Sequence, residues 1–132
     1  MDSKQLIDLA KEARESAFAE ISCFKVGAAL LTRSGKVFLG CNIEDPSGIG
    51  VTNICAERCA MVKALSEGHR DFEKIAVVGG IDKLIFCTPC GVCRQYLNTL
   101  CPDIIIICLD ENNNIIEYTM NDLLPHSFSE KF

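Results

Sequence analysis

The strongest constraint on the fold is the alternation of short apolar runs with helical segments in the second half of the chain. Apolar runs over 74–80 and 103–110 are bounded by turn residues, and a helical segment over 90–100 separates them. Two strands that are connected through a helix can lie parallel in one sheet, because the helix returns the chain to the starting edge. The sequence therefore predicts an α/β fold with parallel strands and helices on both faces of the sheet.

The other periodic segments complete the order α-β-β-α-β-α-β-β-α. No internal repeat or domain boundary interrupts them. We therefore expect residues 1–132 to form a single domain, a three-layer α/β/α sandwich around a mixed five-stranded sheet. The remaining predicted elements are a helix over 3–20 with Ser3 as its N-cap, a hairpin of 24–32 and 37–44, a helix over 54–68 closed by Gly68, a strand over 112–119 and a helical turn over 120–124.

Charge and hydropathy limit the classes of partner. The net charge is −5 and the isoelectric point is near 5.0, whereas a nucleic-acid backbone requires clustered lysine and arginine. No apolar run reaches the roughly 18–20 residues of a membrane span. Residues 1–18 carry charges throughout, which is not the pattern of a secretory signal. We expect a cytoplasmic protein whose partners include neither nucleic acid nor membrane.

Nine cysteines are an unusual number for a chain of 132 residues. The count is odd and the export signal is absent, so a reduced compartment is expected and a disulfide framework is not. Cysteine also packs as a small hydrophobic residue. We assign that role to the four cysteines in or beside apolar stretches, which are Cys23, Cys41, Cys101 and Cys108.

Three further cysteines occupy the starts of predicted helices. Cys55 begins one helix, and Cys90 and Cys93 form a C-x-x-C at the start of the next. Helix N-termini can converge at the carboxyl ends of neighbouring parallel strands, and each one lowers the pKa of a thiol placed there. Three thiolate ligands would leave one position of a tetrahedral Zn²⁺ open for water, which is the catalytic arrangement. The pKa of such a water is about 7.

Two charged residues follow Cys55 closely. Glu57 can take a proton from the metal's water and pass it to a leaving group. Three thiolates on a divalent ion leave a net negative charge, which the Arg58 guanidinium would offset by donating to sulfur. Taken alone, Glu57 and Arg58 could equally be a solvated pair at a helix start.

Two other readings of the cysteines remain open at this point. Cys59 or Cys87 could complete a closed four-cysteine structural zinc site, which would make the chain a non-catalytic zinc-binding module. The C-x-x-C could also be a redox motif. The long gap from Cys55 to Cys90 exceeds zinc-finger spacing, and a thioredoxin-like motif would follow the first strand of the fold.

The combination of C-A-E with P-C-x-x-C is the signature of zinc deaminases. The sequence resembles the small cytidine deaminase family, of the short-chain, homotetrameric type with an all-cysteine zinc site, over nearly its whole length. The matching blocks are FKVGAALLT (24–32), GCNIE (40–44), ICAERCAMVKALSEG (54–68), TPCGVCRQ (88–95) and LLPHSF (123–128).

The resemblance implies a role for each matching residue. Cys55, Cys90 and Cys93 would hold Zn²⁺, Glu57 would move protons, and Arg58 would moderate the thiolate charge. The substrate-binding residues would be Asn42 and Glu44 at the ribose hydroxyls, Phe24 in the pyrimidine pocket, the backbone of Ala56 at the base, and Phe128 stacking on the base of a neighbouring subunit. Without the resemblance, Asn42 and Glu44 would be read as a strand-end turn and Phe24 as core.

The implied activity is zinc-dependent hydrolytic deamination of cytidine and 2′-deoxycytidine in pyrimidine salvage, by a homotetramer with shared active sites. The segment 45–53 departs from the family pattern, because it is about two residues longer and lacks the aromatic residue near the 5′ side of the sugar. This difference motivates an alternative substrate, a cytosine-bearing small molecule such as blasticidin S. A deaminase that edits nucleic acids is disfavoured by the acidic charge balance.

Overall fold

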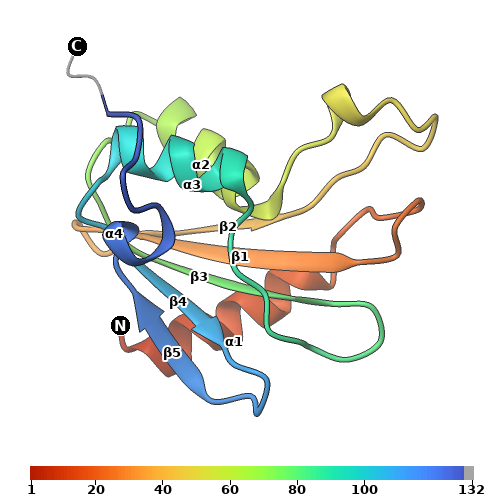
Figure 1. Cartoon of the computed structure of the whole chain (residues 1–132), viewed down its shortest axis with the longest axis horizontal. Helices are drawn as coiled ribbons and strands as arrows, with labels where there is room; N and C mark the ends of the chain where they lie inside the picture. The colour runs from red at the N-terminus through yellow and green to blue at the C-terminus, as the bar shows by residue number, and fades with distance from the viewer. Residues whose placement is uncertain (130–132) are drawn as a thin grey trace.

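The computed structural model describes residues 1–129. Its elements follow one another in the predicted order (Figure 1). They are α1 (Ser3–Arg14), β1 (Lys25–Thr32), β2 (Val37–Cys41), a 3₁₀ turn (Gly50–Thr52), α2 (Ala56–Ser66), β3 (Phe72–Gly80), α3 (Gly91–Leu100), β4 (Ile105–Leu109), β5 (Ile115–Tyr118) and α4 (Met120–Leu123).

The five strands form one sheet in the order β2-β1-β3-β4-β5. Strands β3 and β4 are parallel and are connected through α3, whereas the other three pairings are antiparallel. The mixed five-stranded sheet predicted from the alternation of strands and helices is therefore confirmed.

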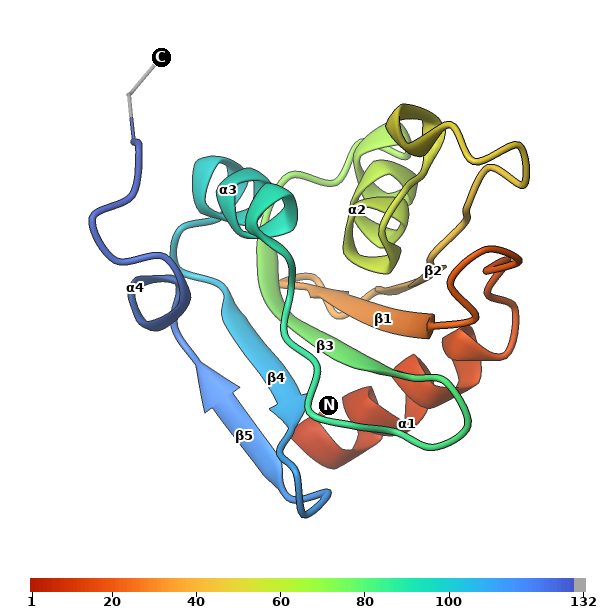
Figure 2. The same cartoon turned by 45° about the vertical axis from the view of Figure 1, so that its right-hand side comes forward.

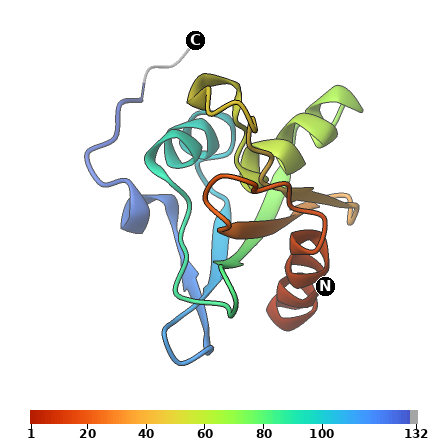
Figure 3. The same cartoon turned by 90° about the vertical axis from the view of Figure 1, so that its right-hand side faces the viewer.

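Helices cover both faces of the sheet. Helix α1 lies on one face, and α2 and α3 lie side by side on the other (Figures 2 and 3). The central strands contribute side chains to the hydrophobic core on each face of the sheet. In β3, Ile75 and Val77 pack under α2 and α3, while Ala76 and Val78 pack under α1. Alternate residues of a strand point to opposite faces, which explains why these runs are apolar throughout.

Two glycines allow the helices to approach the sheet closely. A Cβ at Gly27 of β1 would overlap backbone atoms of Ala10 and Arg14 in α1. A Cβ at Gly40 of β2 would overlap backbone atoms of Ala56 and Ala60 in α2. The absence of a side chain at Gly40 therefore sets how closely the first turn of α2 lies against the sheet.

The first helix is shorter than predicted. It begins after Asp2, which is the N-cap in place of Ser3: the Asp2 carboxylate accepts from Gln5 N, and Gln5 Oε1 accepts from Asp2 N. It ends at Arg14 rather than residue 20, because Phe18 N donates to the Asn42 carbonyl and the Phe18 carbonyl accepts from Glu44 N. Backbone pairing with a distant segment thus replaces the last predicted turn. Within residues 1–129, no helix combines the length and apolarity needed to cross a membrane.

The assignment of Cys23 to the core is wrong. Its side chain is exposed and its φ is 59°, because it lies in a tight turn in which Cys23 N donates to the Ala19 carbonyl. Cys41 is only half-buried. Cys101 and Cys108 are buried as predicted, and burial raises the pKa of each thiol to about 12. These two cysteines behave as small hydrophobic residues.

Candidate metal centre

The three cysteines singled out by their spacing come together in space. The Sγ atoms of Cys55, Cys90 and Cys93 all lie within 4.8 Å of one another, and those of Cys55 and Cys90 are 3.7 Å apart. Cys55 is the N-cap of α2, Cys90 is the N-cap of α3, and Cys93 lies in the first turn of α3. Figure 2 shows these two helices beside each other over the sheet, so that residues 35 positions apart share one site.

The local electrostatics favour thiolate at this site. The pKa of Cys55 is lowered to about 5, first by a hydrogen bond from Cys93 and then by hydrogen bonds from Arg58 and Cys90. The pKa of Cys93 is raised, because it shares its hydrogen bond with Cys55 and is buried. Three soft sulfur donors that are close together, with the pKa of one of them lowered, fit Zn²⁺. They leave one position of a tetrahedral ion for water.

Arg58 lies against the sulfur atoms from the first turn of α2. Its Nη2 donates to Cys55 Sγ at 3.7 Å, and hydrogen bonding to Cys55, and less strongly to Cys93, raises the pKa of the guanidinium. Its Nε is buried and has no hydrogen-bond partner among residues 1–129. A fixed positive charge at this distance offsets the negative charge that three thiolates carry.

Glu57 is the buried acid of the site. Its side chain is 4% exposed, and burial, with a smaller contribution from the Cys55 thiolate, raises its pKa to about 7. A carboxyl group with this pKa can both accept and release a proton near neutral pH. It stands two residues after Cys55, so its side chain shares the start of α2 with one of the three sulfur atoms, while the other two come from the start of α3.

The other two cysteines considered as ligands lie outside this group. Within residues 1–129, the set of side chains close enough to share one ion is Cys55, Cys90 and Cys93. Cys59 is buried in α2, and Cys87 is half-buried ahead of α3, where burial raises the pKa of its thiol to about 12. The geometry therefore gives an open three-sulfur site and not a closed four-cysteine one.

Asn42 fastens the start of β1. Asn42 Nδ2 donates to the Phe24 carbonyl at 2.7 Å, and Asn42 Oδ1 accepts from Val26 N at 2.9 Å. Phe24 is half-buried, and its ring and Cys87 Sγ both lie 2.9 Å from where a Cβ on Gly79 would stand. The missing side chain at Gly79 thus makes room for the Phe24 ring. Neither the part played by Gly79 nor the bonds made by Asn42 has a signal in the sequence spacing.

Glu44 holds the neighbouring turn. Its Oε1 accepts from Ile21 N and Ser22 N, both at 3.0 Å, and its Oε2 accepts from the Ser22 hydroxyl at 2.6 Å. These bonds, that of the Ser22 side chain foremost, lower the pKa of Glu44. Ser22 is a site residue that sequence reasoning missed, because a lone serine in a turn carries no motif.

The last two predicted substrate-binding residues, Ala56 and Phe128, differ sharply in their exposure to solvent. Ala56, the first residue of α2, is fully buried beside Cys55. Phe128 is 69% exposed, and its carbonyl accepts from Gln95 Nε2 at 3.0 Å. The sulfur cluster lies at the N-terminus of α3, whereas Phe128 is held at a later turn of this helix and its ring is free to contact another molecule.

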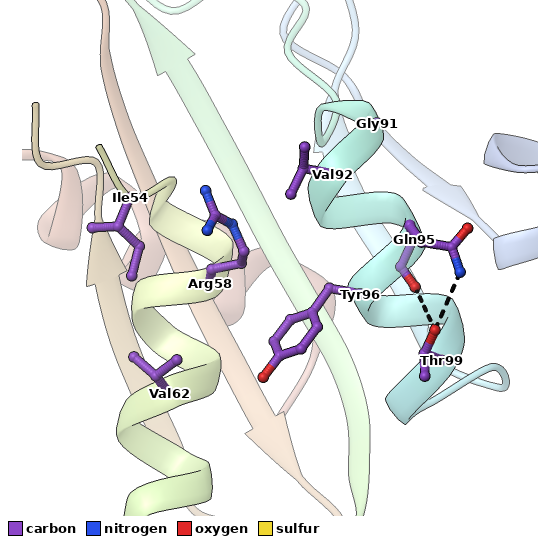
Figure 4. Close-up of a pocket in the computed structure, with 8 residues that line it drawn as sticks. All are labelled: Ile54, Arg58, Val62, Gly91, Val92, Gln95, Tyr96 and Thr99. Carbon is purple, nitrogen blue, oxygen red and sulfur yellow. Dashed lines mark hydrogen bonds between the residues drawn. The ribbon is translucent and has the colours of Figure 1, made fainter. Parts of the chain in front are cut away.

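A largely apolar groove of about 710 Å³ runs between α2 and α3 (Figure 4). Its walls include the exposed side chains of Val62 and Val92, and Arg58 connects it to the sulfur cluster. The groove is lined by Ile54, Arg58, Val62, Gly91, Val92, Gln95, Tyr96 and Thr99.

The segment 45–53 is closed by hydrogen bonds to Asp45. The Asp45 carboxylate accepts from Ser47 N, from Ser47 Oγ and, at 2.6 Å, from Thr52 Oγ1. Asn53 Oδ1 accepts from Asp45 N. Val51 lies in the 3₁₀ turn and is 91% exposed. The segment is therefore an ordered turn that presents an apolar side chain.

Known proteins similar to this chain include cytidine deaminases and a blasticidin-S deaminase. A family model described as the cytidine and deoxycytidylate deaminase zinc-binding region matches residues 1–109. A cytidine deaminase from Halalkalibacterium halodurans is 46% identical over 98% of this chain and 96% of its own length. A blasticidin-S deaminase from Bacillus cereus is 30% identical over 96% of this chain and 94% of its own length.

The fold is shared with solved structures of cytidine deaminases. The crystal structure of a cytidine deaminase from Burkholderia pseudomallei superimposes with a TM-score of 0.87 at 43% identity, covering 97% of this chain and 100% of that one. Nearly the whole of this chain therefore has a counterpart in a protein of nearly equal length.

Proposed function

This chain belongs to the cytidine deaminase family, and from that premise we propose that it converts cytidine and 2′-deoxycytidine to uridine and 2′-deoxyuridine with release of ammonia. The observation that carries the proposal is the buried Glu57 in the first turn of α2, two residues after Cys55, whose sulfur converges with those of Cys90 and Cys93 from α3. Hydrolytic deamination requires a metal that activates water and an acid that moves protons between that water and the base. The three sulfur atoms could hold such a metal, and Glu57 is such an acid.

The mechanism assigns the proton transfers to Glu57. Cys55, Cys90 and Cys93 would hold Zn²⁺, which would supply Lewis-acid chemistry: it would lower the pKa of water to about 7 and so make a nucleophile for C4 of the base available near neutral pH. Glu57 accepts a proton from the attacking water and donates it to N3 of the ring. It then takes the second proton of that water and delivers it to the departing amine, which leaves as ammonia. The C4–O bond replaces the C4–N bond, and Glu57 returns to its starting state.

The pKa of Glu57 suits this double role. A carboxyl group of ordinary pKa would remain ionised at neutral pH and would be a poor donor to the amine. Burial raises the pKa of Glu57 to about 7, so that both proton states are accessible. Arg58 and the helix N-termini hold the sulfur atoms in place while charge shifts at the ring.

Substrate recognition is proposed for five further groups. Phe24 lines the base pocket, the Ala56 backbone contacts the base, and Phe128 stacks on the base of a neighbouring subunit. Asn42 and Glu44 bind the ribose hydroxyls with the oxygen lone pairs that remain beside their bonds to the 21–26 segment. Asn42 and Glu44 would each bind the sugar and, at the same time, hold the loop that carries Phe24.

A second candidate is a deaminase of another cytosine-bearing molecule, such as blasticidin S. The observations in its favour are the blasticidin-S deaminase relative at 30% identity and the altered 45–53 segment with its exposed Val51. The cytidine deaminase relative at 46% identity and the presence of both Asn42 and Glu44 favour the nucleoside.

We further propose a single-domain protein that works as a homotetramer in the cytoplasm, in pyrimidine salvage. The apolar groove between α2 and α3 and the exposed Phe128 support an assembly in which neighbouring copies complete each other's sites. Nine free cysteines suit a reducing compartment. Light scattering coupled to size exclusion measures the mass of the assembly, and a monomeric mass for an active enzyme would contradict the shared site.

One assay tests the activity. Purified protein with its zinc quantified per chain is incubated with cytidine, 2′-deoxycytidine, cytosine and blasticidin S, and ammonia release is followed. We expect turnover of the two nucleosides and a stoichiometry of one zinc per chain. Turnover of blasticidin S without turnover of cytidine would replace the proposal by the second candidate. Bound zinc without turnover of any of the four compounds would favour a non-catalytic zinc-binding module.

A further inference from the structure

Arg94 connects two parts of the chain that the reaction needs. It follows Cys93 in the first turns of α3, and its guanidinium makes three hydrogen bonds. Nε donates to the Pro89 carbonyl at 2.7 Å, Nη2 donates to Thr88 Oγ1 at 2.8 Å, and Nη1 donates to the Leu123 carbonyl at 2.7 Å. The first two acceptors immediately precede Cys90, and the third lies at the end of α4.

The two residues bonded to Arg94 on the metal side control where Cys90 stands. Pro89 is joined directly to Cys90, which is the N-cap of α3, so the position of the Pro89 carbonyl fixes the chain as it enters the helix. Cys90 is exposed, and Cys90 Sγ lies 3.7 Å from Cys55 Sγ. An exposed sulfur ligand at a loop–helix junction depends on the neighbouring backbone for its position, because little packing surrounds it.

The same helix also holds the C-terminal segment. Beyond the bond from Arg94 to Leu123, Asn98 Nδ2 donates to Ser127 Oγ at 3.2 Å, and Gln95 Nε2 donates to the Phe128 carbonyl at 3.0 Å. Three polar side chains of α3 thus contact the segment from Leu123 to Phe128 along its length. In Figure 2 this segment runs from α4 past α3.

We propose that Arg94 is a positioning residue that aligns the Cys90 ligand loop and the Phe128 segment on one helix, with Gln95 and Asn98 setting the place of Phe128. The part of the inference that concerns Phe128, the substrate arm, rests on the proposed function. The part that concerns zinc binding, the metal arm, does not depend on the substrate. Each acceptor of Arg94 is neutral, so the guanidinium acts here through the directions of its N–H groups and not through a carboxylate partner. Lysine keeps the charge and cannot reproduce three divergent bonds from one planar group.

The metal arm is tested by zinc retention. Arg94→Lys, Thr88→Val and Thr88→Ser are compared with the wild type, and Arg33→Lys is the matched control, because Arg33 is an exposed arginine that pairs with Asp71. Zinc affinity is measured by competition with a colorimetric chelator. The absorption spectrum of the Co²⁺-substituted protein reports the sulfur ligands.

We expect Arg94→Lys to weaken zinc binding about 10–100-fold, as loss of an outer partner of a metal ligand does. Thr88→Val is expected to weaken it less but in the same direction, since it removes one acceptor and leaves Arg94 intact. Thr88→Ser, which keeps the hydroxyl, and Arg33→Lys are expected to bind zinc as the wild type does. Wild-type affinity and Co²⁺ spectra in both Arg94→Lys and Thr88→Val would overturn the inference. If Arg94→Lys does not fold, the pair of Thr88 variants decides the question alone.

The substrate arm is tested by steady-state kinetics. We expect Gln95→Ala with Asn98→Ala to raise KM for cytidine about two- to tenfold, the equivalent of one or two lost hydrogen bonds, with kcat and zinc content unchanged. In a Phe128→Ala background the same pair is expected to raise KM no further. Asn112→Ala, an exposed amide in the β4–β5 turn, is the control. An unchanged KM, or the same rise in both backgrounds, would overturn the role assigned to Gln95 and Asn98.

The two kinds of failure are distinguishable. A wild-type protein that binds zinc but turns over no cytidine would contradict the proposed function, while the zinc measurements on Arg94→Lys and Thr88→Val would still decide the metal arm. A wild-type protein that is active, with variants that match it in zinc affinity and KM, would contradict only the positioning role.

Discussion

The Ser22 hydroxyl donates a 2.6 Å hydrogen bond to the Glu44 carboxylate, and this contact joins the turn before Phe24 to the segment that follows β2. Glu44 also accepts from Ile21 N and Ser22 N, so three donors of one turn converge on a single carboxylate. The residue proposed to bind the sugar therefore also holds in place the residue proposed to line the base pocket. Under the proposed function, sugar and base recognition would therefore be mechanically connected.

Removal of the Ser22 hydroxyl tests that connection. We expect Ser22→Ala to raise KM for cytidine about two- to tenfold and to leave kcat nearly unchanged, because it loosens the Phe24 turn without touching Glu57. Steady-state kinetics measure the effect. The exposed Ser66→Ala, whose hydroxyl bonds only within α2, is the control. Equal kinetics for both variants would show that the turn does not influence substrate binding.

The hydrogen bonds to Glu44 also predict a pH dependence of stability. They lower the pKa of Glu44 in the folded state, so its contribution is present above the unfolded value of about 4.3 and is lost as pH falls through the folded value. We expect the difference in unfolding free energy between the wild type and Glu44→Gln to shrink as pH falls below about 4. Urea titrations at a series of pH values measure it. A difference that stays constant with pH would mean that Glu44 is uncharged or unbonded in solution.

Loss of the acid at the metal site separates chemistry from metal binding. We expect Glu57→Ala to lower kcat by at least about 10²-fold, since general acid–base catalysis contributes about 10²–10⁴-fold, while zinc content stays at the wild-type level. Ammonia release and metal analysis of the same preparation measure the two quantities. Near-normal turnover of this variant would contradict the role of Glu57 as the proton carrier.

The cysteines divide into ligands and packing residues, and serine substitutions separate them. Cys90→Ser is expected to lose zinc, because the hydroxyl is a far weaker ligand than thiolate for a sulfur site. Cys59→Ser is expected to retain zinc, since Cys59 lies outside the group of three sulfur atoms. Metal content per chain measures both. Loss of zinc in Cys59→Ser would support the closed four-cysteine site.

Much of this arrangement could be predicted from local sequence patterns. Apolar runs with turn residues at both ends predicted the strands, and cysteines at two helix starts predicted the sulfur cluster, because each of these patterns is local in sequence. That Cys55 meets Cys90, 35 positions later, follows from the placing of α2 and α3 side by side on one face of the sheet (Figure 2). The end of α1 at Arg14 could not be predicted, since it depends on bonds between Phe18 and the distant residues Asn42 and Glu44. The exposure of Cys23 has the same cause: because the helix ends at Arg14, Cys23 lies in a tight turn rather than beside a strand.

The unpredicted part of the site has the same physical origin. Side-chain hydrogen bonds to backbone atoms, such as those of Arg94 to the Pro89 and Leu123 carbonyls, need no particular residue at the acceptor. They therefore leave no motif. Family resemblance could assign Asn42 and Glu44 to the sugar, but only the structure shows that both also fasten the 21–26 segment.

The position of α2 on the sheet gives the last prediction. A Cβ at Gly40 would overlap backbone atoms of Ala56 and Ala60, which lie in the turns that follow Cys55. Backbone cannot move aside as a flexible side chain can, so Gly40→Ala has to displace the start of α2, together with Cys55 and Glu57. We expect it to lower the free energy of unfolding by about 1–3 kcal/mol and to reduce zinc affinity.

The control for Gly40→Ala is a substitution at a glycine where an added Cβ would contact no other atom. A Cβ at Gly50 would have no neighbour within 4 Å, and the φ of Gly50 does not lie in the left-handed region. Gly50→Ala is therefore expected to change the free energy of unfolding by no more than about 0.5 kcal/mol and to leave zinc affinity unchanged. Denaturant titrations and chelator competition on both variants measure the contrast. If Gly40→Ala proved as stable as Gly50→Ala and bound zinc equally well, the close contact between β2 and the first turns of α2 would not be what holds Cys55 and Glu57 in place.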